Sequence, residues 1–380
     1  MSFTQAHPES PAGNSTLVLS ASDLSALVRA TGLHCFMDQL IDQLETTLLD
    51  FDAQRIEVPA RSGFYYQNPQ LGLMEWMPVF RKEEAVLMKM VGYHPANPVQ
   101  NHLPTILSTY SLYSPLTGSF LAIADGTFLT ALRTGAASAI ASRRLAKPDS
   151  RVLGLIGAGA QAMSQLHALN RHFPLERVLV HDINPAAAHS FAARIAPLEL
   201  GPLEIEVTDP RSLLAVSDIV CTATSVDLGA GPVIPTDADR RPWLHFNAVG
   251  SDLPGKTELP LSLLREALVI PDFLRQAENE GECQQLQPEE IGPELSEIIQ
   301  KPELVRGARE RLTVFDSTGY ALEDLLAMTL VVELALKHRI GNWIQFEAAS
   351  SDPLNPYEMV LSPAAGKTGQ GASRLSLNVS

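Results

Sequence analysis

The chain is poor in cysteine, and its few cysteines exclude two classes of protein. The 380 residues contain three scattered cysteines, Cys35, Cys221 and Cys283, and no Cys-x-x-Cys pair. An odd number of isolated cysteines favours neither a disulfide framework nor a zinc site, and it fits a reducing compartment. No pair of His, Asp or Cys residues has the spacing of metal ligands, so we expect no metal.

Basic residues and long apolar runs are also scarce. The chain has 28 Lys and Arg against 43 Asp and Glu, a net charge of −15, and no basic cluster. This balance argues against nucleic acid and anionic membrane as partners. No run approaches the roughly 18 consecutive apolar residues that cross a bilayer, and the first residues lack a signal-peptide core. We therefore expect a soluble, cytoplasmic protein that acts on a small molecule.

The most informative stretch that is present is segment 157–162, Gly-Ala-Gly-Ala-Gln-Ala. It follows the apolar run 152–156 and leads into a helical pattern, which is the strand, glycine turn and helix of a dinucleotide-binding unit. Gly157 allows the tight turn, Gly159 lets the backbone approach a pyrophosphate, and the small Ala162 lets the helix pack on the strand. The helix N-terminus then offers N–H groups to the phosphates.

A second anchor supports this interpretation. Segment 177–182 reads as the next strand and ends in Asp182, at the spacing expected for a ribose-binding acid. A carboxylate there binds the adenosine ribose hydroxyls and repels a 2′-phosphate, which favours NAD over NADP. The alternative is a glycine turn in an α/β protein without a nucleotide, and the two anchors together favour the cofactor.

The alternation of strands and helices predicts an α/β fold with two domains. From residue 147 to 319 the pattern is that of a Rossmann-type, doubly wound parallel sheet that binds NAD. Residues 1–146 read as an α/β domain with a mixed sheet, which we predict binds the substrate and which a helix at 321–340 within residues 320–360 completes. Residues 361–380 read as a flexible tail. The predicted strands of the Rossmann domain are 152–156, 177–182, 203–208, 218–224, 243–249, 268–272 and 311–316.

In the first domain, charged residues within apolar segments are the candidates for substrate contacts. Lys89 lies in the apolar run 86–91; it is either buried and paired, which marks function, or at a sheet edge with its ammonium in water. Arg133 lies near the start of a helix of small residues, where it could clamp a carboxylate or form a surface salt bridge. Arg61 and Glu75 have the same two interpretations.

A third cluster follows the predicted strand 243–249. In open α/β sheets, ligands bind in the crevice beyond the carboxyl ends of the strands. Asp252 lies there and could act as a general base toward a substrate amine, or it could cap a turn. Segment 314–319 ends another strand on the same edge.

Taken together, these segments resemble the ornithine cyclodeaminase/μ-crystallin family. The resemblance runs from about residue 17 to 345, and within the family it is greatest to bacterial ornithine cyclodeaminase. The segments that carry it are 130–137, 156–161, 247–259 and 315–319 followed by Leu322-Glu-Asp, with 75–78, 92–97 and 280–286 supporting the subfamily.

The resemblance implies an enzyme that converts L-ornithine to L-proline and ammonia with NAD used catalytically, as a homodimer formed through the first domain. A hydride would leave the substrate Cα and later return to the cyclic imine. By matching position, Asp252 and Lys89 would be catalytic, Asp252 as the acid/base for the amine. The substrate would be held by Arg61, Lys89, Arg133 and Glu75. The NAD site would comprise Thr105, Arg133, Gly157, Gly159, Ala160, Gln161, Asp182, Thr224, Val249, Gly250, Ser251, Asp252, Lys256 and Ser317.

Two alternatives stay open. One is a net redox enzyme of the same family, an amino-acid dehydrogenase or cyclic-imine reductase. The other is a non-catalytic ligand carrier, against which the intact set of candidate residues argues. Segment 62–71 is longer than expected between Arg61 and Glu75 and could reshape the substrate pocket. One methylene in a pocket is worth only about 1–3 kcal/mol, so the sequence does not separate ornithine from lysine.

Overall fold

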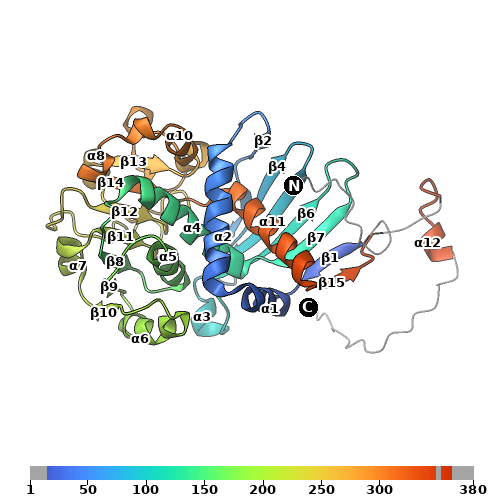
Figure 1. Ribbon diagram of the computed structural model, residues 1–380, viewed down its shortest axis with the longest axis horizontal. Helices are drawn as coiled ribbons and strands as arrows, with labels where there is room; N and C mark the ends of the chain where they lie inside the picture. Colours follow the sequence, from blue (N-terminus) through green and yellow to red (C-terminus); the bar gives the residue numbers. More distant parts are fainter. Residues whose placement is uncertain (1–14, 348–351, 362–380) are drawn as a thin grey trace.

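The computed structural model describes residues 15–347 and 352–361, and its strands form two sheets in two lobes (Figure 1). The predicted tail lies outside the described residues from position 362 onward. The first sheet has the strand order β15-β1-β7-β6-β5-β4-β2, with β3 paired to β4. The second has the order β10-β9-β8-β11-β12-β14-β13. An α/β fold with a mixed sheet and a parallel sheet was expected, and this is confirmed.

The first sheet is mixed because β1 runs parallel to β7 while the other pairings are antiparallel. Along β4 and β5, buried residues alternate with more exposed ones, so one face of the sheet is covered. The longer segment after Arg61 contains β3, which pairs with β4 as a hairpin. The strands of this sheet are β1 (Thr16–Leu19), β2 (Ile56–Glu57), β3 (Ser62–Tyr66), β4 (Gly72–Arg81), β5 (Ala85–Tyr93), β6 (Ile106–Tyr113), β7 (Phe120–Asp125) and β15 (Asn342–Ile344).

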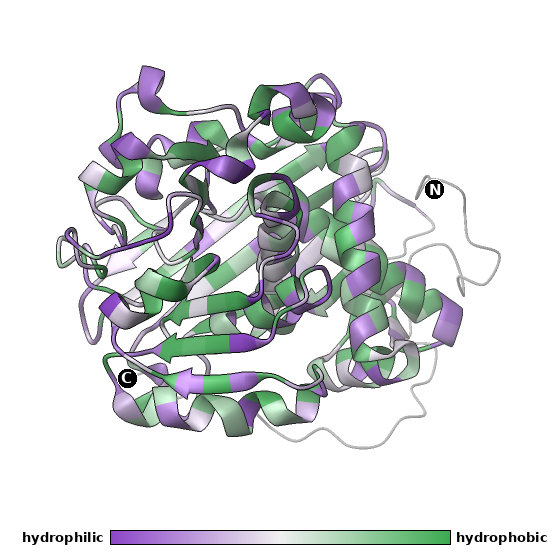
Figure 2. Cartoon of the chain, turned by 60° about the vertical axis from the view of Figure 1, so that its left-hand side comes forward, coloured by the Kyte–Doolittle hydropathy of each residue, from purple (hydrophilic) through white to green (hydrophobic). Residues whose placement is uncertain are grey.

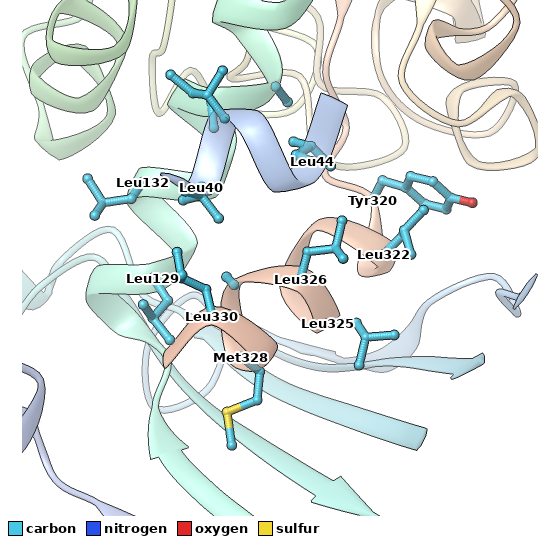
Figure 3. Packing of buried hydrophobic residues seen from close by; sticks show 14 of the residues in the cluster. Leu40, Leu44, Leu129, Leu132, Tyr320, Leu322, Leu325, Leu326, Met328 and Leu330 are labelled. Carbon is cyan, nitrogen blue, oxygen red and sulfur yellow. The ribbon is translucent and has the colours of Figure 1, made fainter. Parts of the chain in front are cut away.

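Helices cover one face of the first sheet and bury the largest apolar core with it (Figure 3). Phe36, Leu40, Leu44 and Leu48 recur every fourth residue, and all four are buried on one side of a helix. Burying a side chain of this size stabilises the fold by about 1.5–3 kcal/mol. The helices of this lobe are α1 (Ala21–Thr31), α2 (Leu33–Leu49), α3 (Asn97–Gln100), α4 (Thr127–Leu145) and α11 (Ala321–His338), while α12 (Glu358–Leu361) stands apart from it (Figure 1).

The second sheet is entirely parallel and doubly wound, as predicted. Its first strand in sequence, β8, is the third in the sheet order, with β9 and β10 on one side and β11, β12, β14 and β13 on the other. Figure 2 shows its strands coloured largely as hydrophobic, because helices cover both faces. The strands are β8 (Val152–Ile156), β9 (Arg177–His181), β10 (Glu204–Val207), β11 (Ile219–Thr222), β12 (His245–Ala248), β13 (Leu268–Pro271) and β14 (Thr313–Asp316). The helices are α5 (Ala160–Asn170), α6 (Pro185–Ile195), α7 (Pro210–Val216), α8 (Leu261–Glu266), α9 (Leu274–Ala277) and α10 (Leu295–Gln300).

Helix α4 joins the two lobes. Its first turns pack in the core of the first lobe, and Gly135 lies so close to α5 that a Cβ would meet the Ser164 carbonyl oxygen at 2.6 Å. Near its end, the Ser142 hydroxyl accepts a hydrogen bond from Asn247 Nδ2 at 3.0 Å and lies 3.1 Å from His245 Nε2, both on β12. Strand β12 of the second sheet is therefore held against α4. In the described part of the chain, no helix has the length and apolar character needed to cross a membrane.

Candidate active site

The glycine turn between β8 and α5 has the geometry of a phosphate-binding loop. Gly157 adopts φ +93°, and a Cβ there would collide with the Ala223 carbonyl oxygen, so only glycine fits. Helix α5 begins at Ala160 with no side chain capping its N–H groups. A Cβ at Gly159 would meet nothing within 4 Å. Open space in front of uncapped N–H groups is what a pyrophosphate requires.

Asp182 lies directly beside this turn, at the end of β9. Its carboxylate accepts hydrogen bonds from the Ala158 N–H at 2.7 Å and the Asn184 N–H at 2.8 Å. Arg194 holds the same residue of the turn from the other side, donating to the Ala158 carbonyl at 2.6 Å. A carboxylate offers about four lone-pair directions, so Asp182 keeps acceptors for ribose hydroxyls.

Several other predicted cofactor residues lie at the carboxyl edge of the same sheet. Thr224 follows β11, the segment from Val249 to Ser251 follows β12, and Ser317 follows β14. Ser317 is 2 % exposed, and its hydroxyl has no hydrogen-bond partner among the described residues. A buried hydroxyl without a partner costs free energy, which a cofactor amide placed there would recover. The residues on this edge therefore fit a nicotinamide dinucleotide.

Arg61 gathers three acidic residues at the junction of the two lobes. Its Nε donates to Glu280 Oε1 at 2.5 Å, and its Nη1 lies 3.8 Å from Glu75 Oε2. Its Nη2 donates to the main-chain carbonyl of Asp252 at 2.9 Å. The structure thus brings together Arg61, Glu75 and Asp252, which the sequence proposed separately, and adds Glu280.

The carboxylate of Asp252 pairs with Lys256, which lines a hollow. Its Oδ1 accepts from Lys256 Nζ at 2.8 Å, and its side chain is 33 % exposed while Lys256 is buried. Lys256 Nζ also lies 5.2 Å from the centre of the Tyr93 ring. The adjacent hollow has a volume of about 430 Å³. It is lined by Tyr65, Gln67, Leu71, Tyr93, Val226, Asp227, Leu228, Leu253 and Lys256, so the hairpin of segment 62–71 forms part of its wall.

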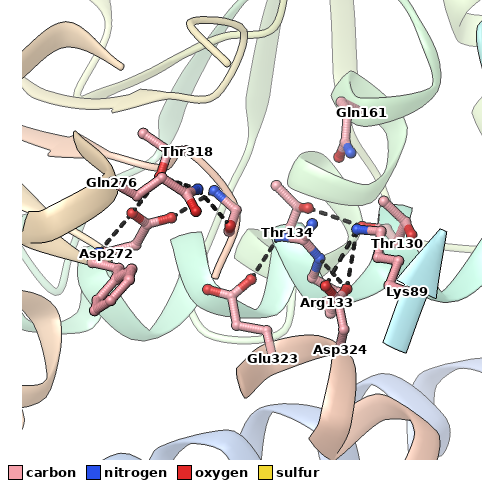
Figure 4. A network of polar contacts seen from close by, with 12 residues as sticks. Lys89, Thr130, Arg133, Thr134, Gln161, Asp272, Gln276, Thr318, Glu323 and Asp324 are labelled. Carbon is pink, nitrogen blue, oxygen red and sulfur yellow. Dashed lines mark hydrogen bonds and ion pairs between the residues drawn. The ribbon is translucent and has the colours of Figure 1, made fainter. Parts of the chain in front are cut away.

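Lys89 and Arg133 meet at one carboxylate of α11 (Figure 4). Lys89 Nζ lies 3.2 Å from Asp324 Oδ1, and Arg133 Nε lies 3.0 Å from the same oxygen. Arg133 Nη1 also donates to Glu323 Oε2 at 2.7 Å, and the Tyr110 hydroxyl donates to Asp324 Oδ1 at 2.6 Å. Lys89 is 1 % and Arg133 4 % exposed. The sequence left two alternatives for Lys89, buried and paired or at a sheet edge, and the structure shows it buried and paired. Arg133 is also buried and does not form a surface salt bridge.

Burial shifts the ionisation of both clusters. It lowers the pKa of Lys89 to about 8, and the positive charge of Arg133 contributes. It raises the pKa of Glu280 to about 7 against the opposing effect of Arg61, and it raises the pKa of Glu75. The charge of Lys89 acts on Glu75, and that of Arg61 acts on Lys89, so the two clusters are electrostatic neighbours. Such shifted groups are typical of sites that move protons.

Two predicted residues have only local contacts. Thr105 precedes β6, and its carbonyl accepts from the His94 N–H at 2.8 Å. Gln161, in the first turn of α5, accepts from the Ser164 hydroxyl at 3.1 Å. In the described part of the chain, no group of three or more His, Cys, Asp or Glu side chains is placed to hold a metal ion.

Several buried acids of the site were missed by the sequence analysis. Glu323 and Asp324 stand inside the apolar helix α11, and Glu280 stands in a segment noted for its resemblance alone. Glu258 is fully buried and bonds Thr224 and Gly250. For Glu323 and Asp324 the available signal was a charged residue within an apolar segment, the same signal that identified Lys89, whereas the polar loops that carry Glu280 and Glu258 gave none.

Comparison with known proteins extends this description. The model of the "Ornithine cyclodeaminase/mu-crystallin family" matches residues 22–339. The L-lysine cyclodeaminase of Streptomyces rapamycinicus is 42 % identical over 345 residues, covering 90 % of this chain and 99 % of that protein. A solved structure described as the structural basis for recognition of L-lysine, L-ornithine and L-2,4-diamino butyric acid by lysine cyclodeaminase superposes with a TM-score of 0.86 at 46 % identity, covering 90 % of this chain and 99 % of the other. An archaeal alanine dehydrogenase dimer with bound NAD superposes with a TM-score of 0.77 at 30 % identity, covering 88 % and 100 %.

Proposed function

The chain belongs to the ornithine cyclodeaminase/mu-crystallin family, and we propose that it catalyses the NAD-dependent cyclodeamination of an L-α,ω-diamino acid. The product is a cyclic imino acid and ammonia, which is L-pipecolate from L-lysine or L-proline from L-ornithine. Two observations support NAD as the cofactor. A related archaeal alanine dehydrogenase has NAD bound, and the glycine turn, Asp182 and Ser317 of this chain fit a dinucleotide.

The observation that carries the proposal is the excess of acid around Arg61. Glu75, Glu280 and Asp252 face two cations, Arg61 and Lys256, so the formal charge of the group is −1. A diamino acid at neutral pH carries one carboxylate and two ammonium groups, with a net charge of +1. The site is therefore complementary to a diamino acid, whereas a monoamino acid such as alanine leaves one acid unpaired.

The chain supplies three cations and several proton acceptors for this reaction. We assign the substrate carboxylate to Arg61, Lys89 and Arg133, because the charges of both arginines reach Lys89. NAD, when bound, would supply reversible hydride transfer at the substrate Cα, so the net reaction would not be a redox change. Asp252 accepts the proton of the α-ammonium, and Glu280, whose pKa is about 7, accepts that of the ω-ammonium so that this nitrogen can attack.

L-Lysine is the substrate to test first. The sequence analysis named L-ornithine, and the 42 % identity to an L-lysine cyclodeaminase shifts our proposal toward the longer diamino acid. The hollow beside Asp252 and its hairpin wall with Tyr65 supply room at the ω end.

We further propose that the protein is a homodimer formed by the uncovered face of the first sheet. Met90 on β5 and Leu107 on β6 are 38 % and 40 % exposed on this face. Trp76 and Met88 point to the same side of the pleat and are half-buried. A wide apolar face of this kind is typical of a protein–protein interface.

The test is incubation of the purified protein with L-lysine, L-ornithine or L-2,4-diaminobutyrate and a trace of NAD. We expect cyclic product and ammonia in equal amounts with no lasting change in NADH absorbance. Stoichiometric NADH formation from any amino acid would instead support a net dehydrogenase. Absence of turnover with all three diamino acids would refute the proposal.

A further inference from the structure

Three buried acids at the carboxyl edge of the second sheet hold one another's backbone in series. We call Asp316, Glu282 and Glu258 the carboxylate series. Asp316 and Glu282 each accept hydrogen bonds from the backbone N–H groups of the segment that carries the next acid, and Glu258 accepts from those of two loops at the sheet edge. All three are fully buried, and no ion pair to Lys or Arg joins them among the described residues.

The first acid fixes the segment that carries Glu280. Asp316, the last residue of β14, accepts from the Glu282 N–H at 2.9 Å and the Cys283 N–H at 2.8 Å. Gly281 adopts φ +78°, and a Cβ there would lie 2.6 Å from Asp316 Oδ2. The acid therefore occupies the space that a side chain at 281 would fill.

The second acid fixes the segment that carries Glu258. Glu282 accepts from the Glu258 N–H at 2.7 Å and the Leu259 N–H at 3.2 Å. Gln285 Nε2 donates to the same carboxylate at 2.8 Å. Both oxygens of Glu282 are therefore engaged.

The third acid joins the ends of β11 and β12. Glu258 Oε1 accepts from the Thr224 N–H at 2.7 Å, and Oε2 accepts from the Gly250 N–H at 2.8 Å. The hydroxyls of Thr222 and Thr224 each donate to it at 2.7 Å. A Cβ at Gly250 would collide with Glu258 Oε1. Glu258 thus sets the turn that begins two residues before Asp252.

A stable core does not require this arrangement. Burying an acid is costly unless it is hydrogen-bonded, and apolar residues of similar volume stabilise a core at least as well. Burial raises the pKa of all three acids, which reports that cost. What the carboxylate series provides instead is a fixed backbone geometry between three loops that meet at the site.

We propose that Glu258 is a positioning residue that sets the Gly250–Asp252 turn against the cofactor edge at Thr224, with Glu282 and Asp316 holding Glu258 in place. The role of Asp252 rests on the proposed cyclodeaminase function. The link from Glu258 to the Gly250 backbone does not, because it is read from contacts of the protein alone.

The test compares Glu258→Gln with Glu266→Gln, the same change at an exposed acid eight residues further along. Two donors point at each carboxylate oxygen of Glu258. In the Gln variant an NH₂ group replaces one of these oxygens and cannot accept from its two donors, so the turn loses part of its anchor. We expect hydrogen exchange of the Gly250 amide to rise at least about tenfold in Glu258→Gln without cofactor. We expect kcat to fall about 30-fold or more with KM changed less than about threefold, because misplacing a reacting group by about 1 Å costs on the order of 100-fold.

A second variant covers the case in which Glu258→Gln does not fold. Thr222→Val removes one donor to Glu258 without changing shape, and we expect about threefold changes in the same directions. Unchanged exchange at Gly250 and unchanged kcat in either folded variant would overturn the proposal. If wild-type protein turns over no diamino acid while Gly250 exchange rises in Glu258→Gln, the proposed function fails and the positioning link stands.

Discussion

Arg61 is bonded to the main chain of Asp252 and not to its carboxylate. The guanidinium donates to the Asp252 carbonyl at 2.9 Å, while the carboxylate pairs with Lys256 at 2.8 Å. The loop is therefore anchored independently of the side chain that we assign to proton transfer. A change in the Asp252 side chain leaves the anchor in place.

Replacing Asp252 by Asn should abolish turnover of the diamino acid and leave NAD affinity within about threefold of wild type. The amide cannot accept the amine proton, while the backbone bond to Arg61 persists. Steady-state kinetics and calorimetric NAD titration measure the two effects. Asp237→Asn, an exposed acid paired with Arg211, is the control. Loss of NAD binding in Asp252→Asn would mean that its role is in the cofactor site.

The stability of the protein should depend on pH through Glu280. Burial raises the pKa of Glu280 from 4.5 to about 7. A raised carboxyl pKa stabilises the fold fully below about pH 4.5, and that contribution is lost as the pH rises through 7. The free energy of unfolding of wild type relative to Glu280→Gln should fall between pH 5 and pH 8, by on the order of 3 kcal/mol at 1.36 kcal/mol per pKa unit.

Urea unfolding at several pH values measures this difference. Glu266→Gln should run parallel to wild type at every pH. A constant difference between wild type and Glu280→Gln would show that Glu280 is ionised throughout.

Replacing Asp182 by Ala should weaken NAD binding by about tenfold or more. The change removes the ribose acceptor and releases the Ala158 N–H in the glycine turn, and hydrogen bonds to charged groups are worth about 1.5–3 kcal/mol. Asp209 is a matched control because it also accepts two backbone N–H groups, at the start of α7. Asp209→Ala should lower stability and leave NAD affinity unchanged. Equal NAD affinities in the two variants would show that Asp182 does not bind the adenosine ribose.

A charge on the uncovered face of the first sheet should dissociate the proposed dimer. Leu107→Asp places a carboxylate where an apolar contact is expected, so light scattering after gel filtration should give the monomer mass. Leu304, 47 % exposed on the other lobe, supplies the control Leu304→Asp, which should remain dimeric. A wild-type monomer, or a dimeric Leu107→Asp, would exclude this face as the interface.

The sequence predicted the parts of the site that depend on local pattern. The glycine turn and Asp182 were found because strand, turn and helix follow one another within one βαβ unit. The burial of Lys89 was one of two interpretations of a lysine in an apolar strand. Its partner could not be predicted, because Asp324 lies 235 residues further along the chain and nothing in either segment specifies the pairing.

The carboxylate series was missed for the same reason. Glu258 bonds Thr222 across 36 residues, and Asp316 reaches Glu282 across 34. Each acid stands in a loop or at a strand end, where periodicity carries no information. Only the order of strands in the sheet brings these loops to one edge.

The close fit between Glu258 and Gly250 links the inheritance of the two positions. Since a Cβ at 250 would occupy the space of the carboxylate, a lineage that keeps the acid cannot gain a side chain there. Shortening the acid alone would not open the position, because the Thr224 backbone nitrogen would still lie 2.7 Å from that Cβ. At position 281, the φ of +78° and the Thr318 methyl group at 2.5 Å exclude a side chain together with Asp316. Among descendants of this chain, both glycines should therefore persist while the acids are kept, and loss of an acid alone should not release them.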